Sequence, residues 1–403
     1  MQPWPGEVLE ERAGEIAVGF AALLTRQAAW RHRRVETIEV LSHEQVRRSV
    51  SVDFTVPREH RAELALGDGQ WVVPLAVLDK RKLVHFDLLG EDGYALPLMR
   101  SDEVQLIARE LLYMVLDIDL EGAELDVDMD DLIERVLAAG PDDGPVMNAR
   151  VAEVAARAPE FAALATTLTS GFLLCAVLTD VSRRRVVKFA YDEPLGHPDR
   201  FSHFYGTQGC SEAASYHVEL AVPDGMRARS ADIVDNRSGD LLLEGPRDSD
   251  RPGLHYVAGA ETSAEPGLSV RYATERGGFL VPAMLVAWVI ALELGLAFLF
   301  ADLHGIATTG GPAVAVLLSI SAVFSSLVLR AGEHPLVQLV LAPYRMLLAL
   351  ATIAAVLAGA VLAFRGSATL LDVTWGVGAV VAVLAAGILS IEVARAPATA
   401  KRP

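Results

Sequence analysis

The chain has 403 residues, of which 52% are apolar, and its mean hydropathy is positive at +0.33. This apolar content exceeds that of an ordinary soluble protein, so part of the chain is predicted to lie in lipid. The first 275 residues carry 28 basic and 47 acidic side chains, a balance that repels phosphate backbones and excludes general nucleic-acid binding. The only cysteines, Cys175 and Cys210, are too few for a disulfide framework.

Residues 1–100 are predicted to form an N-terminal helix and a β-meander. The apolar pattern from Glu7 to Trp30 is helical. Between residues 49 and 56, apolar side chains alternate with polar ones, which is the period of a strand. Two further runs, Trp71–Leu78 and Leu83–Leu89, are expected to pair as a hairpin around the short turn between them.

Residues 101–170 are predicted to be helical, and residues 171–275 to form an antiparallel β-sandwich. Ser101 is a typical helix N-cap, with two acidic residues in the turn that follows. Strand patterns begin at Gly171, and from residue 215 to 222 every second side chain is apolar, including Val218. Short strands separated by turn residues are typical of a sandwich of about seven strands.

Four C-terminal segments are apolar and long enough to cross a hydrocarbon layer about 30 Å thick, which takes roughly 20 helical residues. They are Phe279–Ala301, Pro312–Leu329, Met346–Phe364 and Val373–Ile391. Residues 276–403 are therefore predicted to form an all-α four-helix transmembrane bundle. The complete fold expected is an α+β soluble region followed by this bundle.

The basic residues at the segment ends predict the orientation, because cytoplasmic flanks retain positive charge during insertion. One side of the predicted bundle collects seven lysine and arginine residues, whereas the other has only Arg365. This bias predicts a multi-pass protein of the inner (plasma) membrane with both termini in the cytoplasm.

Pro343 divides the apolar stretch that leads into the third predicted span. We expect Leu336–Ala342 to be a short helix on the cytoplasmic face, turned into the membrane by the proline. Tyr344 and Arg345 would then lie at the lipid interface. The alternative is one long tilted helix from Leu336 to Phe364, which places Arg345 deeper in lipid.

These pieces resemble uncharacterised bacterial integral membrane proteins that have an N-terminal cytosolic α/β region and C-terminal transmembrane helices. The resemblance is carried by strand and turn patterns that span most of the chain: Val52–Pro57, Phe86–Leu88, Glu91–Gly93, Ala95–Leu98, Ser215–His217 and Pro223–Gly225. It implies this architecture and no known activity, so no functional residue is carried over from it.

No catalytic or nucleotide-binding motif of useful specificity occurs in the sequence, and no catalytic residue is assigned. His197, Asp199 and His203 lie close together in a predicted loop, and imidazole with carboxylate can hold a transition metal. The alternative is a polar loop that joins two strands.

Four basic clusters stand out on the acidic background: Arg31–Arg34, Arg47–Arg48, Lys80–Lys82 and Arg183–Arg185. If they converge in the fold, above all Arg33 and Arg34 with Lys80, Arg81 and Lys82, they can bind an anionic ligand such as a nucleotide or contact lipid head groups near the bilayer. Charges at hairpin turns and sheet edges also protect against unwanted pairing, which is the alternative interpretation.

Glu293 is the one charged residue in the first predicted span, and an ionisable group at that depth is costly unless it is paired or neutral. We expect it to face the bundle and to be hydrogen-bonded to Ser319, Ser321, Ser325, Ser326 or a backbone carbonyl. Its role is then either packing between helices or the transport of an ion.

The sequence thus favours a membrane-anchored, non-enzymatic module whose cytosolic region binds a partner protein or a small ligand. The alternative is a small transporter or channel that uses Glu293. The expected partners are the lipid bilayer, the cytosolic protein or ligand, and further copies of the chain in a homo-oligomer. No cofactor and no nucleic acid is expected.

Overall fold

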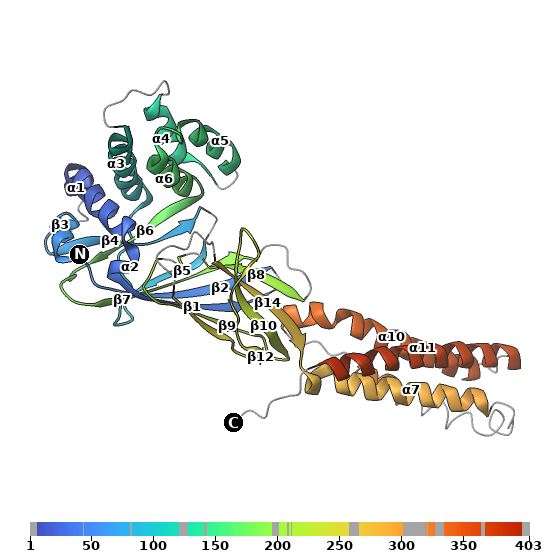
Figure 1. Cartoon of the computed structure of the whole chain (residues 1–403). Helices are drawn as coiled ribbons and strands as arrows, with labels where there is room; N and C mark the ends of the chain where they lie inside the picture. The colour runs from blue at the N-terminus through green and yellow to red at the C-terminus, as the bar shows by residue number, and fades with distance from the viewer. Residues whose placement is uncertain are drawn as a thin grey trace.

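The computed structural model describes residues 6–396 except 43, 81–82, 121–127, 141–142, 196–200, 208, 211, 258–265, 301–318, 320, 327–333 and 364–366. The N-terminal part is rich in sheet and carries a layer of helices, and long apolar helices project from its far end (Figure 1). A sheet-rich region followed by apolar helices is therefore confirmed.

The first helix is followed directly by a strand. The helix predicted from Glu7 to Trp30 is confirmed as α1 (Gly6–Thr25) and α2 (Gln27–Trp30). β1 (Arg31–Val40) then pairs antiparallel with β2 (Gln45–Phe54). These strands lie at the centre of a six-stranded sheet in the order β13-β9-β1-β2-β7-β5, where β1 and β9 run parallel. The other members are β5 (Val84–Leu89), β7 (Arg185–Pro194), β9 (Tyr216–Ala221) and β13 (Gly253–Tyr256).

The predicted hairpin is wrong, and so is the β-meander that included it. β4 (Gln70–Asp79) pairs with β6 (Gly171–Leu178), about a hundred residues later in the chain, whereas β5 joins β7 in another sheet. Both β4 and β6 are buried on both faces, while β5 alternates between exposed and partly buried positions. A strand that is apolar on both faces needs apolar cover on each face and a neighbouring strand that is equally apolar. β5 is not such a strand. A short 3-10 helix, η1 (Arg58–His60), and β3 (Ala65–Gly67) precede β4, and β3 completes this three-stranded sheet.

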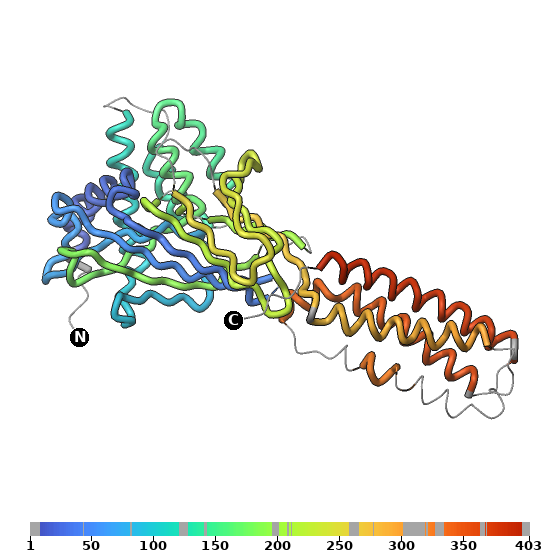
Figure 2. The backbone as a smooth tube through the Cα atoms, turned by 60° about the horizontal axis from the view of Figure 1, so that its bottom comes forward, coloured from blue at the N-terminus to red at the C-terminus, as the bar shows by residue number. Residues whose placement is uncertain are grey.

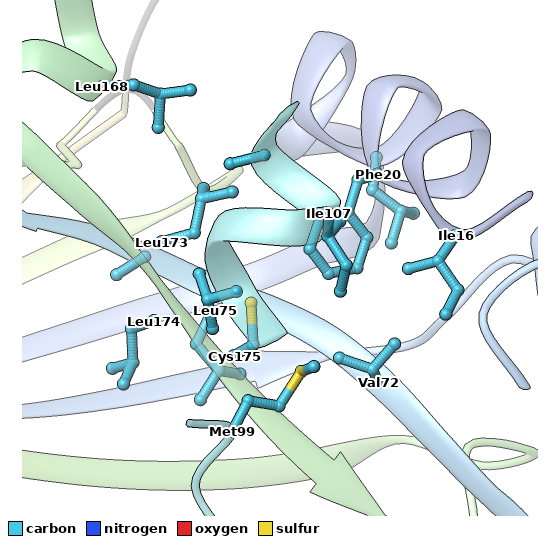
Figure 3. Packing of buried hydrophobic residues seen from close by; sticks show 14 of the residues in the cluster. Ile16, Phe20, Val72, Leu75, Met99, Ile107, Leu168, Leu173, Leu174 and Cys175 are labelled. Atoms are coloured by element: carbon cyan, nitrogen blue, oxygen red, sulfur yellow. The ribbon is translucent and has the colours of Figure 1, made fainter. Parts of the chain in front are cut away.

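The helical segment predicted at residues 101–170 is confirmed as four helices: α3 (Ser101–Leu120), α4 (Met129–Ala138), α5 (Gly144–Val154) and α6 (Pro159–Ser170). With α1 they cover the three-stranded sheet. In the core between them, Phe20 of α1 and Ile107 of α3 meet Leu75 of β4 and Leu173 of β6 (Figure 3). This apolar contact fixes the helical layer on β4 and β6.

The antiparallel sandwich predicted for residues 171–275 is not confirmed, because its strands divide among three sheets. β6 belongs to the three-stranded sheet, and β7, β9 and β13 belong to the six-stranded one. The remaining strands form a third sheet: β8 (Ser202–Gly206), β10 (Met226–Asp235), β11 (Leu241–Leu243), β12 (Arg247–Ser249) and β14 (Pro266–Thr274). The alternation expected around Val218 is correct, since Tyr216, Val218 and Leu220 are all buried.

Three described helices are long and apolar enough to cross a membrane, where four were predicted. They are α7 (Val281–Leu299), which follows η2 (Arg276–Leu280), α10 (Pro335–Ala363) and α11 (Ala368–Arg395). They run side by side away from the sheets (Figure 2). The remaining predicted span, Pro312–Leu329, lies largely outside the described residues, which include only 319 and 321–326 of it.

The break predicted at Pro343 is wrong, since the proline lies inside the single helix α10. Losing a backbone hydrogen bond to proline costs about 3 kcal/mol, and packing offsets it here. Leu336, Val337 and Val340 of the first turns are buried in one cluster with Met226 of β10. At 1.5 Å per residue, the helix is roughly 43 Å long, so these turns extend beyond a hydrocarbon layer of about 30 Å. The first turns of α10 are therefore packed against the sheets.

Candidate functional site

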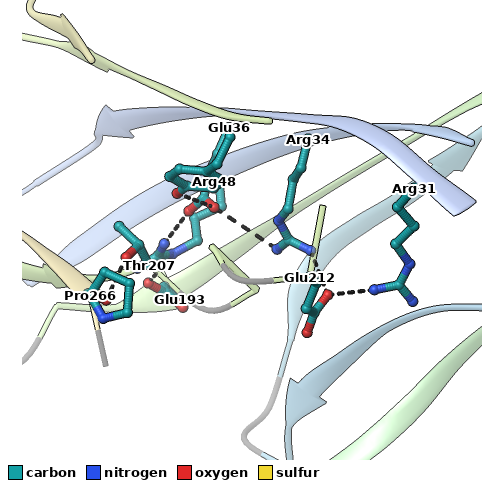
Figure 4. Close-up of polar contacts among 9 residues, drawn as sticks. Arg31, Arg34, Glu36, Arg48, Glu193, Thr207, Glu212 and Pro266 are labelled. Atoms are coloured by element: carbon teal, nitrogen blue, oxygen red, sulfur yellow. Dashed lines mark hydrogen bonds and ion pairs between the residues drawn. The ribbon is translucent and has the colours of Figure 1, made fainter. Parts of the chain in front are cut away.

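Six charged side chains of alternating sign lie in a line inside the soluble region (Figure 4). In order they are Arg31, Glu212, Arg34, Glu36, Arg48 and Glu193, and we call them the buried ionic row. One oxygen of Glu212 lies 2.7 Å from Arg31 Nη1 and 3.4 Å from Arg34 Nη1. One oxygen of Glu36 lies 3.9 Å from Arg34 Nη2, and the other oxygen accepts a hydrogen bond from Arg48 Nη1. Arg48 Nε donates to Glu193.

β1 supplies half of this row, because its alternation puts charged residues on a buried face. Arg34 and Glu36 share the face that continues with Ile38 and Val40. A register shift between Arg31 and Arg33 turns Arg31 inward as well. Arg48 comes from β2, Glu193 from β7, and Glu212 from the segment before β9. The row thus joins elements far apart in the sequence.

The row is neutral as a whole and each of its members makes an ion pair, which is the condition for burying charge. The Nε atoms of Arg31 and Arg34, however, have no hydrogen-bond partner among the described residues. Arg31 and Glu36 are each only 1% exposed. Tyr216 Oη donates to Glu36 Oε2 over 2.9 Å, and Arg31 Nη2 donates to the Pro74 carbonyl over 3.1 Å. Burial lowers the pKa of Arg31 to about 10 although Glu212 opposes this, and burial raises the pKa of Tyr216. Both groups therefore stay protonated at neutral pH, as suits a structural element.

The predicted basic clusters do not form one site among the described residues. Arg34 is buried in the ionic row, while its neighbour Arg33 is exposed. Lys80 follows β4 in the three-stranded sheet and contacts α4 instead. Arg81 and Lys82 lie outside the described residues.

A cavity of about 500 Å³ lies between the helical layer and β6. Its walls are mainly apolar, and they include Leu98, Val104, Leu137, Leu168, Phe172 and Leu174. β6 is an edge strand of its sheet, and Gly171–Cys175 of that strand line the cavity. The volume is in the range of small-molecule sites, which are commonly apolar with a few polar groups that orient the ligand.

Lys80 is the one charged residue in the described lining of this cavity. Its Nζ donates to the carbonyl oxygens of Val136 and Leu137, each over 3.1 Å, at the C-terminal end of α4. Partial burial lowers the pKa of Lys80. An ammonium group has three donors, so one remains for a ligand. The cavity can therefore hold an apolar molecule that carries one hydrogen-bond acceptor.

The predicted metal site is represented by His203 alone, because His197 and Asp199 lie outside the described residues. His203 is buried in β8 among aromatic residues. Its Nδ1 lies 3.3 Å from Tyr205 Oη, and its ring packs edge-on against Tyr272 at 5.1 Å. Among the residues that the structure describes, no group of three metal-ligating side chains occurs.

Glu293 has one of its predicted partners, since Ser321 Oγ donates to Glu293 Oε2 over 2.7 Å.

The predicted interfacial residues lie together near the sheets. Tyr344 is half-buried, and the Arg345 guanidinium stands 5.4 Å from the centre of the Phe279 ring.

Sequence reasoning missed the ionic row and the cavity. The alternation of β1 was the available signal for the row, because it places Arg34 and Glu36 on the same face as Ile38.

No protein-family model and no characterised relative matches the sequence. Among solved structures, an M1 zinc metallopeptidase from Deinococcus radiodurans shares 8% identity at a TM-score of 0.26, over 60% of this chain and 42% of that protein. A variant of the same enzyme matches with a TM-score of 0.25 and the same identity and coverage. This chain thus spans less than half of their length, and a likeness this low assigns neither a fold nor an activity.

We predict that Glu36→Gln destabilises the soluble region strongly. The change leaves Arg34 and Arg48 without the carboxylate between them, and removing one partner of a buried ion pair costs about 3–5 kcal/mol. For the full chain in neutral detergent, the melting temperature should fall by roughly 10 °C. Glu39→Gln is the matched control, because Glu39 is exposed on the same strand. Equal melting temperatures for the two variants would show that the row contributes little.

Proposed function

We propose that this protein is a membrane-anchored, non-enzymatic binding module, whose soluble region takes up a small ligand between the helical layer and β6. The cavity of about 500 Å³ with Lys80 in its wall is the observation that carries the proposal. A catalytic role has less support, because the described lining of the cavity combines one cation with apolar walls and holds no nucleophile and base at hydrogen-bonding distance.

The cavity's chemistry narrows the class of ligand. The apolar walls favour a hydrocarbon or aromatic body, which gains about 25 cal/mol for each Å² removed from water. Lys80 favours a carboxylate or carbonyl oxygen at one end of that body. The expected ligand is therefore a small apolar acid, and the apolar helices keep its binding site next to the membrane.

The cavity can be tested through a cysteine placed at Gln105, an exposed residue of its lining. In a Cys175→Ala, Cys210→Ala background, 4-phenylbutyrate at about ten times its Kd should slow alkylation of Gln105→Cys by N-ethylmaleimide roughly tenfold. Mass spectrometry of the labelled peptide measures the rate. Ala138→Trp places a large ring at the cavity wall and should remove this protection.

Two variants sharpen the test. Ala152→Trp adds the same ring at an exposed position of α5 and should leave the protection intact. Lys80→Met should weaken protection by 4-phenylbutyrate but not by 4-phenylbutanol, which lacks the carboxylate. Unchanged protection in Ala138→Trp would refute binding in this cavity.

We also propose that the protein crosses the inner membrane several times with both termini in the cytoplasm. In a chain whose two cysteines are replaced by alanine, a single cysteine at His304 or Gly366 should react with an impermeant maleimide in intact cells. A cysteine at Ser238, in the turn after β10, should react only after the cells are opened. Labelling of Ser238→Cys in intact cells would reverse the proposed orientation.

A small transporter or channel is the second candidate, and the contact between Glu293 and Ser321 favours it, since intramembrane carboxylates often mark ion paths. If the contact serves packing instead, Glu293→Gln should keep the melting temperature of the wild type, because an amide still accepts the hydrogen bond. Glu293→Ala should lower the free energy of unfolding by about 1 kcal/mol, because it removes the hydrogen bond. Proton flux into liposomes by the wild type and its loss in Glu293→Gln would support the transporter instead.

A further inference from the structure

A second hollow, of about 590 Å³, lies where the third sheet meets α10 at Tyr344 and the C-terminal end of α11. Its lining includes three arginines, Arg229 of β10, Arg271 of β14 and Arg395 of α11, together with Tyr344 and Glu392. We refer to it as the junction pocket. We propose that the junction pocket binds the phosphate headgroup of an anionic membrane lipid.

A β-bulge brings two of these arginines together. The register between β10 and β14 shifts between Ala228 and Ser230, so Arg229 is an extra residue opposite Arg271. Ala228 and Ser230 on either side are buried, whereas Arg229 and Arg271 are exposed. Bulges commonly redirect a side chain, and this one sets two guanidinium groups on the same side of neighbouring strands.

The charge of the junction pocket is unbalanced among the residues that the structure describes. Glu392 is the one acid in this described lining, and its carboxylate already accepts a hydrogen bond from Arg395 over 3.2 Å. Arg229 and Arg271 have no ion pair with any described residue. Like charges on adjacent strands destabilise a sheet. Arg229 and Arg271 nevertheless lie on neighbouring strands without a carboxylate between them, in a soluble region that has 47 acidic side chains. A bound anion supplies the missing negative charge.

The position of the pocket selects a lipid over a soluble phosphate. From Tyr344 to Leu362, α10 covers roughly 28 Å, close to the thickness of the hydrocarbon layer. Tyr344 and the last turn of α11 then lie at headgroup level, where tyrosine and arginine are enriched. Exposed apolar residues beside them, Met346 and Ile391, face the place where acyl chains would lie.

The recognition chemistry follows from the three guanidinium groups. Each can donate two parallel hydrogen bonds to phosphate oxygens, and such charge-assisted bonds are stronger than neutral ones. Basic pockets between membrane helices at headgroup level are suited to lipids with exposed phosphate charge. A zwitterionic headgroup should bind more weakly, because its own cation meets the arginines.

The experiment uses the full chain in neutral detergent, with dioleoyl phosphatidylglycerol as the probe and dioleoyl phosphatidylcholine as the neutral comparison. Native mass spectrometry should find phosphatidylglycerol retained at least tenfold more than phosphatidylcholine. The double variant Arg229→Gln, Arg271→Gln should reduce phosphatidylglycerol retention to the phosphatidylcholine level. The matched control is Arg58→Gln with Arg157→Gln, which removes the same charge from two exposed positions away from the pocket.

Two further measurements separate this proposal from its alternatives. Without lipid, the double variant should melt at or slightly above the wild-type temperature, since it removes a like-charge pair. Phosphatidylglycerol should raise the melting temperature of the wild type and not that of the double variant. Equal loss of retention in both double variants, or equal stabilisation of the wild type by glycerol phosphate and by the lipid, would overturn the proposal.

Discussion

The soluble region depends on one constraint: three buried arginines must each meet a carboxylate. An unpaired charge in an apolar interior costs several kcal/mol, so the ionic row specifies which strands lie together. In β1, Glu36 and Arg34 contact each other. Glu36 also pairs with Arg48 of β2, and Arg34 also pairs with Glu212, which precedes β9. Arg48 pairs in addition with Glu193 of β7. These requirements favour the observed order β9-β1-β2-β7 over a pairing of strands by sequence proximity.

The ends of the sheets also determine how the membrane helices begin. β14 leads through Glu275 into η2 and α7 without a separate linker, and Arg276 Nε donates to the Val393 carbonyl of α11 over 2.9 Å. On the other side, His334 Nε2 donates to the Val40 carbonyl at the end of β1 over 2.8 Å. His334 Nδ1 accepts from Leu336 N over 3.2 Å, so the same ring caps α10. Sheet and helices are thus joined at several points.

Local patterns predicted what depends on neighbouring residues. The helices at residues 101–170 and the alternation around Val218 follow from periodicity, and the apolar spans follow from the length of uncharged runs, both of which a sequence displays directly. Periodicity did not predict the pairing of β4 with β6. Trp71–Leu78 and the run that follows it are close in sequence, so they are expected to pair as a hairpin. What distinguishes the two strands is that the first is buried on both faces and the second is not. The ionic row was missed for a similar reason: Arg34 on its own is typical of a surface, and its counterion Glu212 lies far along the chain.

Contacts of the row also connect the cavity beside β6 with the beginning of α10. Arg31 reaches the Pro74 carbonyl of β4, and β4 pairs with β6, which forms one wall of the cavity. At the other end, Glu193 belongs to β7, whose neighbour β2 pairs with β1, and β1 ends at the bond to His334. Sliding the six-stranded sheet past the three-stranded sheet would break the hydrogen bond from Arg31 to the Pro74 carbonyl, which would leave a buried donor without its acceptor. The cavity, the two sheets and the beginning of α10 are therefore connected by a continuous series of hydrogen bonds and strand pairings.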